Sequence, residues 1–294
     1  MLQLTFQESI MPLAPPPPQP PAPPYGLELN TTMQTVATIV LWVGTAALLV
    51  YAGKMAREER SIFPVALVVA VAVGSIIEPL YDIAYHLHWL DNGEQWTLFT
   101  SFGLPQPVWV MPAYVMVFGL PALLLYRALS RGATLRQIFT LGALTAFTTA
   151  VFEITAINLD LYVYYGESPW RVLDYPLFIA FMEAAQITGF AVLAAVLKLR
   201  ATKEVHNLAL FAIFPCNFAF DVLGAGFPTL ILQNSSPDPN GFALFLSAIA
   251  SVALTATALW WSAQLLLTLQ RRDGITPTGT RTPPETPVRE ASLV

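Results

Sequence analysis

Residues 65–73 read VALVVAVAV, an unbroken apolar run inside a longer apolar segment at residues 62–88. About 20 consecutive apolar residues are enough to cross a bilayer as a helix. A strand of an outer-membrane barrel would alternate apolar and polar residues, and this run does not. Because the bilayer offers no water to backbone N–H and C=O groups, the stretch predicts a transmembrane helix.

Apolar segments of similar length recur along the chain and predict seven transmembrane helices. The composition agrees, because 55% of the 294 residues are hydrophobic and 11% are charged, against about 25% charged in ordinary soluble domains. The class predicted is an all-α polytopic membrane protein, which excludes a nucleic-acid binder and an ordinary cytosolic enzyme. The predicted spans are residues 33–53, 62–88, 106–126, 137–158, 176–197, 207–232 and 242–269.

The basic residues predict the orientation of these spans. Of the 14 lysines and arginines, 13 fall in the loops after spans one, three and five or behind span seven, and only Arg171 falls on the other side. Loops rich in Lys and Arg stay cytoplasmic. We therefore expect an extracytoplasmic N-terminus, a cytoplasmic C-terminus and location in the plasma membrane.

Two tails flank the predicted transmembrane domain of residues 33–270. Residues 1–32 form a predicted extracytoplasmic tail, with nine prolines between positions 12 and 24, a composition typical of polyproline II or disorder. Residues 271–294 are rich in Thr, Pro and charged residues, which predicts a disordered cytoplasmic tail.

Five acidic residues fall inside the predicted spans: Glu78, Asp82, Glu153, Glu183 and Asp221. The direction of each helix places all five in the middle-to-outer part of the bilayer, with no Lys or Arg in any apolar core to pair with them. A carboxyl group in lipid is costly, so such residues indicate a functional site. We expect Glu78 and Asp221 to be the main acid–base pair, with Asp82, Glu153 and Glu183 tuning them.

Prolines next to these acids predict distorted helices around a cavity. Pro79 follows Glu78, and Pro215 and Pro228 flank Asp221; a proline removes one helical hydrogen bond, which membranes tolerate where the chain lines a cavity. Aromatic walls there would stabilise a developing positive charge. The candidate substrate-binding residues are Tyr81, Tyr85, Tyr114, Phe152, Gln186, Asn217 and Phe218.

The predicted outer loops, residues 89–107 and 159–175, are rich in Trp and Tyr. Two interpretations are open. The aromatic side chains form an interfacial belt, or they form a lid over a cavity that opens outward.

We expect neither a cofactor nor a metal, with Asp82 and His86 as the alternative metal pair because they are spaced i, i+4 on one helix face. The three histidines cannot meet in one place. All three lysines fall at inner helix ends, which argues against a retinal Schiff base. The single cysteine, Cys216, excludes an intrachain disulfide.

These observations favour a membrane enzyme that performs acid–base chemistry on an apolar, isoprenoid- or polyketide-like substrate. Cyclisation, isomerisation, hydration and dehydration all fit. The expected partners are the lipid bilayer and an apolar small molecule. A proton- or cation-coupled transporter is the first alternative, although the inner halves of the spans are almost purely apolar. A seven-helix receptor or assembly partner is the second.

Short stretches add a resemblance. Seven spans with an early membrane Glu and a late membrane Asp resemble the fungal integral-membrane meroterpenoid cyclases. The segment Glu78-Pro79-Leu80-Tyr81-Asp82, with residues 103–110 (GLPQPVWV) and Pro112-Ala113-Tyr114, is similar to bacterial multi-span proteins grouped as spirocyclase-like. That grouping implies dehydration and spiroketal formation.

Overall fold

A computed structural model describes residues 21–236 and 238–275. It confirms a predominantly helical chain with seven helices that are long and apolar enough to cross a membrane. The predicted tails lie largely outside the described residues. The seven candidate spans are Thr31–Glu59, Phe63–Tyr85, Val110–Ser130, Leu135–Asn158, Phe178–Arg200, Glu204–Gly224 and Gly241–Arg272.

Three of the spans are broken into shorter helical pieces. The second consists of α2 (Phe63–Gly74), the 3₁₀ turn η1 (Ser75–Ile77) and α3 (Glu78–Tyr85). The third consists of α4 (Val110–Tyr114), the π-helical turn η2 (Val115–Gly119) and α5 (Leu120–Ser130). The sixth consists of η3 (Glu204–Ala209), α8 (Leu210–Phe218) and the π-helical turn η4 (Ala219–Gly224), and the short helix α9 (Phe227–Gln233) follows it. Single π turns inside helices often occur at functional sites.

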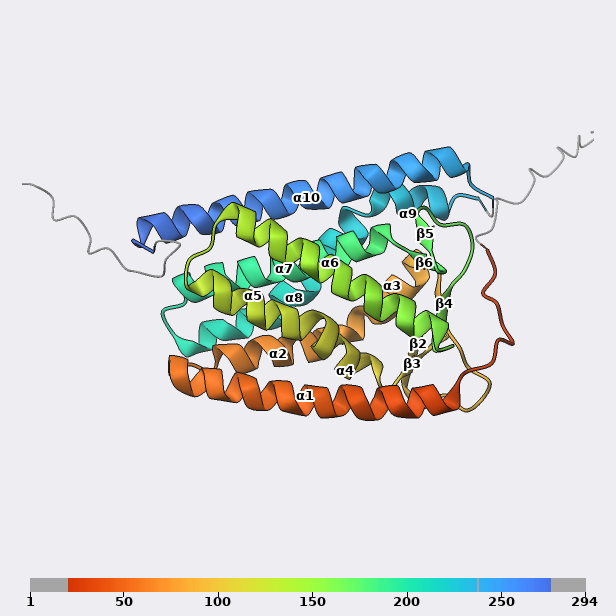
Figure 1. Cartoon of the computed structure of the whole chain (residues 1–294), viewed down its shortest axis with the longest axis horizontal. Coiled ribbons are helices and arrows are strands. Elements are labelled where there is room, and N and C mark those ends of the chain that lie inside the picture. The colour runs from red at the N-terminus through yellow and green to blue at the C-terminus, as the bar shows by residue number, and fades with distance from the viewer. Residues whose placement is uncertain (1–20, 237, 276–294) are drawn as a thin grey trace, which may run out of the picture.

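The other four spans are continuous: α1 (Thr31–Glu59), α6 (Leu135–Asn158), α7 (Phe178–Arg200) and α10 (Gly241–Arg272). Asn30 caps the start of α1, and a Thr134–Gln137 capping box begins α6, so side chains satisfy the free N–H groups there. The centre of the bundle is α7, which packs against α5, α6, α8 and α10. The long helices run side by side, with α1 and α10 on opposite edges (Figure 1).

Six short strands, which the sequence analysis did not predict, form three antiparallel pairs at one end of the bundle (Figure 1). The pairs are β1 (Leu87–Trp89) with β4 (Tyr162–Tyr164), β2 (Thr97–Ser101) with β3 (Leu104–Pro107), and β5 (Arg171–Val172) with β6 (Tyr175–Pro176). The predicted spans 62–88 and 106–126 are therefore too long at one end, because residues 87–88 and 106–107 lie in strands. His86 has a left-handed conformation with φ 57°, which ends α3, and Pro105 and Pro107 favour extended chain.

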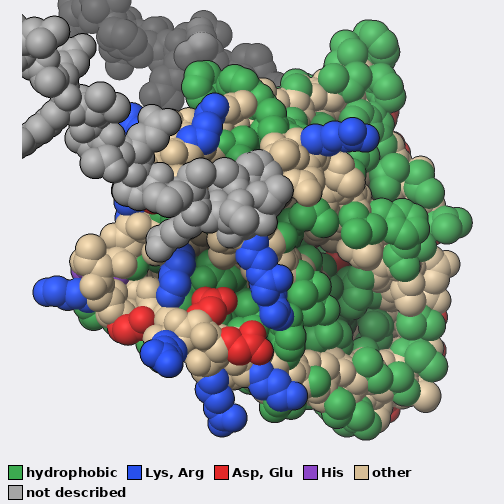
Figure 2. All heavy atoms as spheres, turned by 60° about the vertical axis from the view of Figure 1, so that its left-hand side comes forward, with side chains coloured by type: hydrophobic (Ala, Val, Ile, Leu, Met, Phe, Trp, Pro, Cys, Tyr) green, Lys and Arg blue, Asp and Glu red, His purple; other side chains and the backbone are tan. Residues whose placement is uncertain are grey.

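The opposite end of the bundle carries the basic side chains (Figure 2). Helices α1, α5, α7 and α10 all end there with basic residues in their last turn. The charged end and the strand-bearing end are thus separated by the length of the helices.

Candidate active site

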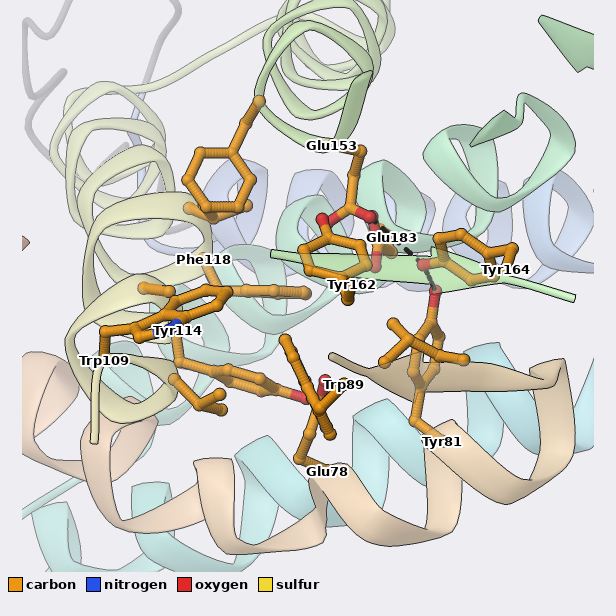
Figure 3. Close-up of a pocket in the computed structure, with 15 residues that line it drawn as sticks. Glu78, Tyr81, Trp89, Trp109, Tyr114, Phe118, Glu153, Tyr162, Tyr164 and Glu183 are labelled. Carbon is orange, nitrogen blue, oxygen red and sulfur yellow. Dashed lines mark hydrogen bonds between the residues drawn. The ribbon is translucent and has the colours of Figure 1, made fainter. Parts of the chain in front are cut away.

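A buried pocket lies between α3, α4, η2, α6, α7 and the strands β1 and β4. Acidic and aromatic side chains line it together (Figure 3). The residues that line it are Glu78, Tyr81, Leu87, Trp89, Trp109, Val110, Ala113, Tyr114, Val117, Phe118, Phe152, Glu153, Tyr162, Tyr164 and Glu183.

Three carboxyl groups from three different spans reach this pocket. Glu78 is the first residue of α3, Glu153 lies near the end of α6, and Glu183 lies in the second turn of α7. All three side chains are buried, and Glu183 interacts electrostatically with both Glu153 and Glu78. The structure therefore gathers three of the five predicted acids in one place, and their catalytic role stays a prediction.

Tyrosine hydroxyls hold two of these carboxyl groups. Tyr114 donates a hydrogen bond to Glu78. Tyr164 donates to Oε2 of Glu153 at 3.1 Å, and its hydroxyl also shares a 2.8 Å hydrogen bond with the hydroxyl of Tyr81. Buried hydrogen bonds of this kind fix the orientation of the carboxyl groups.

The carboxyl group of Glu183 is less completely bonded. Tyr81 and Tyr175 lie close to it, yet its Oε2 atom has no well-aligned hydrogen-bond partner among the described residues. A buried polar atom without a partner calls for a water molecule or a ligand. The Oε2 atom of Glu183 therefore offers a bonding position to a molecule that enters the pocket.

The tyrosines outside the spans remain neutral donors. Burial, and then the neighbouring Glu153, raise the pKa of Tyr162 and Tyr164 above the ordinary value. Burial, and then Glu183, raise the pKa of Tyr175 in the same direction. These phenols can therefore donate hydrogen bonds without losing their protons.

Four aromatic residues at the strand-bearing end cover this pocket, and we call them the lid, whereas Trp96 in the loop of residues 89–107 is exposed. Trp89, Trp109, Tyr162 and Tyr164 are all buried and line the pocket. Trp89 packs edge-on against both Trp109 and Tyr162. The pairing of β1 with β4 brings these rings together from segments more than 70 residues apart.

Asp82 lies beside the pocket and binds the lid. One of its oxygens accepts hydrogen bonds from Nε1 of Trp89 at 2.9 Å and from Nε2 of Gln106 at 2.6 Å. Gln106 is buried between Pro105 and Pro107 in β3 and is not among the predicted site residues. Its position between two prolines in an outer loop was the only signal available.

Asp221 lies away from the pocket, so the predicted pairing of Glu78 with Asp221 is not formed. Asp221 accepts a 3.0 Å hydrogen bond from Thr255 in α10 and, with Asn217, lines a separate cavity next to Gly189 in α7. Phe218 occupies the side of this span that faces the pocket, where its ring packs against Tyr81 and Tyr114.

Some of the predicted substrate-binding residues lie at the pocket, and others lie away from it. Tyr81, Tyr114 and Phe152 line the pocket, and Phe218 packs behind it. Tyr85 is turned away, because its hydroxyl bonds to the carbonyl of Val222. The Gln186 side chain is fully buried and has no hydrogen-bond partner among the described residues.

Asp82 and His86, the alternative metal pair, make separate contacts. Nε2 of His86 bonds to Oδ1 of Asn234 at 2.9 Å, and its ring stacks on Tyr165. Burial lowers the pKa of His86 below its ordinary value. Within residues 21–236 and 238–275, no three His, Cys, Asp or Glu side chains are grouped as a metal ion would require.

The pocket is small as it stands. Its free volume is about 30 Å³, which is room for one or two water molecules. A larger molecule therefore needs the aromatic side chains or the lid strands to move. No family model, curated protein or solved structure matches this chain.

Proposed function

We propose that this protein is an integral-membrane enzyme that performs acid–base chemistry on an apolar substrate. The observation that carries the proposal is the meeting of Glu78, Glu153 and Glu183, from three spans, in one buried pocket with aromatic walls. Carboxyl groups in a dry site can act as general acid and general base. Cyclisation, isomerisation, hydration and dehydration of an isoprenoid- or polyketide-like molecule all use such a pair.

The contacts suggest a role for each carboxyl group. Glu183, with an unpartnered oxygen, contacts the substrate and transfers a proton to or from it. Glu153, oriented by Tyr164, interacts electrostatically with Glu183 and takes the opposite part in the transfer. Glu78 is held by Tyr114 and sets the electrostatic balance of the pocket. The faces of Trp89, Trp109 and Phe118 stabilise positive charge that develops on a carbon skeleton.

The proposed setting is the plasma membrane, with the N-terminus outside and the C-terminus in the cytoplasm. The clustering of basic side chains at one end of the bundle supports it (Figure 2), because basic loops stay cytoplasmic. In this orientation the strands and the pocket lie toward the extracytoplasmic leaflet, which lipid-soluble molecules reach directly.

The test is complementation of a deletion strain, with lipid extracts compared by mass spectrometry. The molecule that accumulates on deletion is the substrate candidate, and the wild-type gene is expected to remove it. Glu183→Gln and Glu153→Gln are expected to lower turnover by about 10²-fold or more. Asp221→Asn, outside the pocket, and Glu167→Gln, on an exposed outer loop, are expected to complement. Full complementation by both pocket variants would overturn the proposal.

Proton-coupled transport is the second candidate, and one observation favours it. Gln186 and Thr188 follow Glu183 along α7, are fully buried, and have side chains without hydrogen-bond partners among the described residues. A polar path could thus continue inward from the pocket. Proton flux in proteoliposomes that disappears in Gln186→Leu would support this candidate over the enzyme.

A further inference from the structure

Another cavity, open at the surface of the bundle, adjoins the pocket. It is a groove between α1, η2 and α5 on one side and α6 on the other, with a free volume of about 410 Å³. The groove exists because α6 packs mainly against α7 and makes few contacts with α5. Its lining residues are Leu41, Met116, Val117, Leu120, Pro121, Leu124, Leu125, Ala128, Leu141, Leu144, Thr145, Thr148, Thr149 and Phe152.

Two side chains belong to both cavities. Val117, in the π-helical turn η2, and Phe152, in α6, line the groove and the acidic pocket alike. Both are only partly buried, and neither is fixed by a hydrogen bond. They separate the two spaces, so a rotation of these side chains would connect them.

The chemistry changes along the groove. Between its end near Ala128 and Leu141 and its end near Val117, the groove is lined by apolar side chains and by threonines. At the pocket end, the buried hydroxyl of Thr149 has no hydrogen-bond partner among the described residues. Thr149 lies four residues before Glu153, on the same face of α6. The groove therefore leads from a hydrocarbon-like surface to an unpaired hydroxyl and then to the carboxyl groups.

We propose that the groove binds the hydrocarbon chain of the substrate and admits its head to the pocket between Val117 and Phe152. The inference rests on the proposed function and narrows the substrate to an elongated, single-chain lipid with a neutral oxygen-bearing head. Leu141 and Phe152 are separated by 11 residues, about 16 Å of helix at 1.5 Å per residue, which sets the length of chain held. A phospholipid is unsuited, because its charged headgroup stays at the membrane surface while the polar end of this groove lies inside the bundle.

The experiment uses the full chain in phosphatidylcholine vesicles and two photoreactive probes. One is a 16-carbon alcohol with a diazirine on its chain, and the other is a phosphatidylcholine with the same diazirine on one acyl chain. After irradiation, mass spectrometry compares labelling of residues 141–152 with labelling of the lipid-exposed face of α10. The alcohol is expected to label the α6 segment several-fold more than α10, and the phospholipid is expected to label both alike.

Leu144→Trp is the blocking variant and Leu254→Trp its matched control. Both leucines are exposed on spans, Leu144 by 57% and Leu254 by 43%, so neither change disturbs a packed core, and only Leu144 lines the groove. Leu144→Trp is expected to reduce alcohol labelling of the α6 segment several-fold, and Leu254→Trp to leave it unchanged. Equal labelling of α6 and α10 by the alcohol, or no effect of Leu144→Trp, would overturn the groove as a chain site.

The variant Glu183→Gln tests the proposed chain site independently of the proposed function on which it rests. The variant is expected to keep wild-type labelling of the α6 segment while it loses turnover. Groove-specific labelling together with undiminished turnover in Glu183→Gln would support the chain site and overturn the proposed chemistry. If Glu183→Gln loses turnover but Leu144→Trp leaves labelling of the α6 segment unchanged, the proposed chemistry is supported and the chain site is overturned.

Discussion

At the scale of single residues, Tyr164 links the lid to the carboxyl groups of the pocket. Its hydroxyl bonds to both Tyr81 and Glu153, while its neighbour Tyr165 stacks on His86 outside the pocket. The hydroxyl of Tyr164 thus links the lid strand β4 to the helix α6. Loss of that hydroxyl deprives a buried carboxyl group of a hydrogen-bond donor, which costs more than loss of an exposed hydrogen bond.

Tyr164→Phe is therefore expected to destabilise the protein by about 1–3 kcal/mol and to lower turnover. Tyr165→Phe is the matched control, and a change within about 0.5 kcal/mol is expected. Thermal unfolding in detergent measures both. Equal stability of the two variants would show that the Tyr164 hydrogen bonds do not hold the pocket together.

His86 gives the molecule a pH dependence outside the spans. Its folded pKa is lowered by burial, whereas an unfolded histidine titrates near about 6.5. Between those two values the unfolded chain binds more protons, so the free energy of unfolding falls as the pH drops below about 6.5. Asparagine tolerates the left-handed backbone at this position, and the variant His86→Asn removes the titration of the imidazole. The wild-type melting temperature is expected to fall more steeply than that of His86→Asn from pH 7.5 to pH 5, and parallel curves would contradict this.

The direction in which each acidic side chain faces could be predicted from the sequence only in part. Depth along each span placed Glu78, Glu153 and Glu183 in one layer, and the structure brings these three together. Depth did not reveal the direction in which Asp221 faces. A π-helical turn adds a residue to the helix repeat at η4, so the regular spacing of 3.6 residues per turn no longer indicates which face a side chain occupies.

At the scale of elements, the seven spans could be predicted because each is an apolar run of sufficient length. The prolines indicated the distortions of the second and sixth spans, whereas the π-helical turn η2 in the third span and the strands could not be placed. Leu87–Trp89 pairs with Tyr162–Tyr164, and nothing local in either segment indicates a partner so far away along the chain. The lid residues Trp89, Trp109 and Tyr162 were visible only as an aromatic-rich pair of loops.

Close packing at the end of α2 gives a prediction at this scale. A methyl group added at Gly74 would overlap the ring of Phe214, whereas one added at Gly53 in α1 meets nothing within 4 Å. Gly74→Ala is expected to cost about 1–3 kcal/mol through overpacking, and Gly53→Ala is expected to be neutral or stabilising by up to about 1 kcal/mol. Thermal unfolding of the pair checks it. An unaffected Gly74→Ala variant would show that α2 and α8 are not packed this closely.

At the scale of the whole molecule, the proposed setting of the pocket depends on the orientation of the bundle in the membrane. In a Cys216→Ala background, Glu167→Cys and Lys203→Cys place single thiols on exposed residues at opposite ends of the bundle. A membrane-impermeant maleimide added to intact cells is expected to label Glu167→Cys at once and Lys203→Cys only after permeabilisation. The reverse pattern would place the pocket toward the cytoplasmic leaflet.

The measurement that decides most directly whether the pocket is one catalytic unit is a double-mutant cycle on turnover of the accumulated substrate. Groups that act as a unit are strongly non-additive, whereas independent sites multiply. The turnover of the double variant Glu153→Gln/Glu183→Gln is expected to be hardly lower than that of the slower single variant. By contrast, adding Asp221→Asn to Glu183→Gln is expected to lower turnover by the same small factor as Asp221→Asn alone. If the rate losses of Glu153→Gln and Glu183→Gln multiply in full, the two carboxyl groups do not share one reaction.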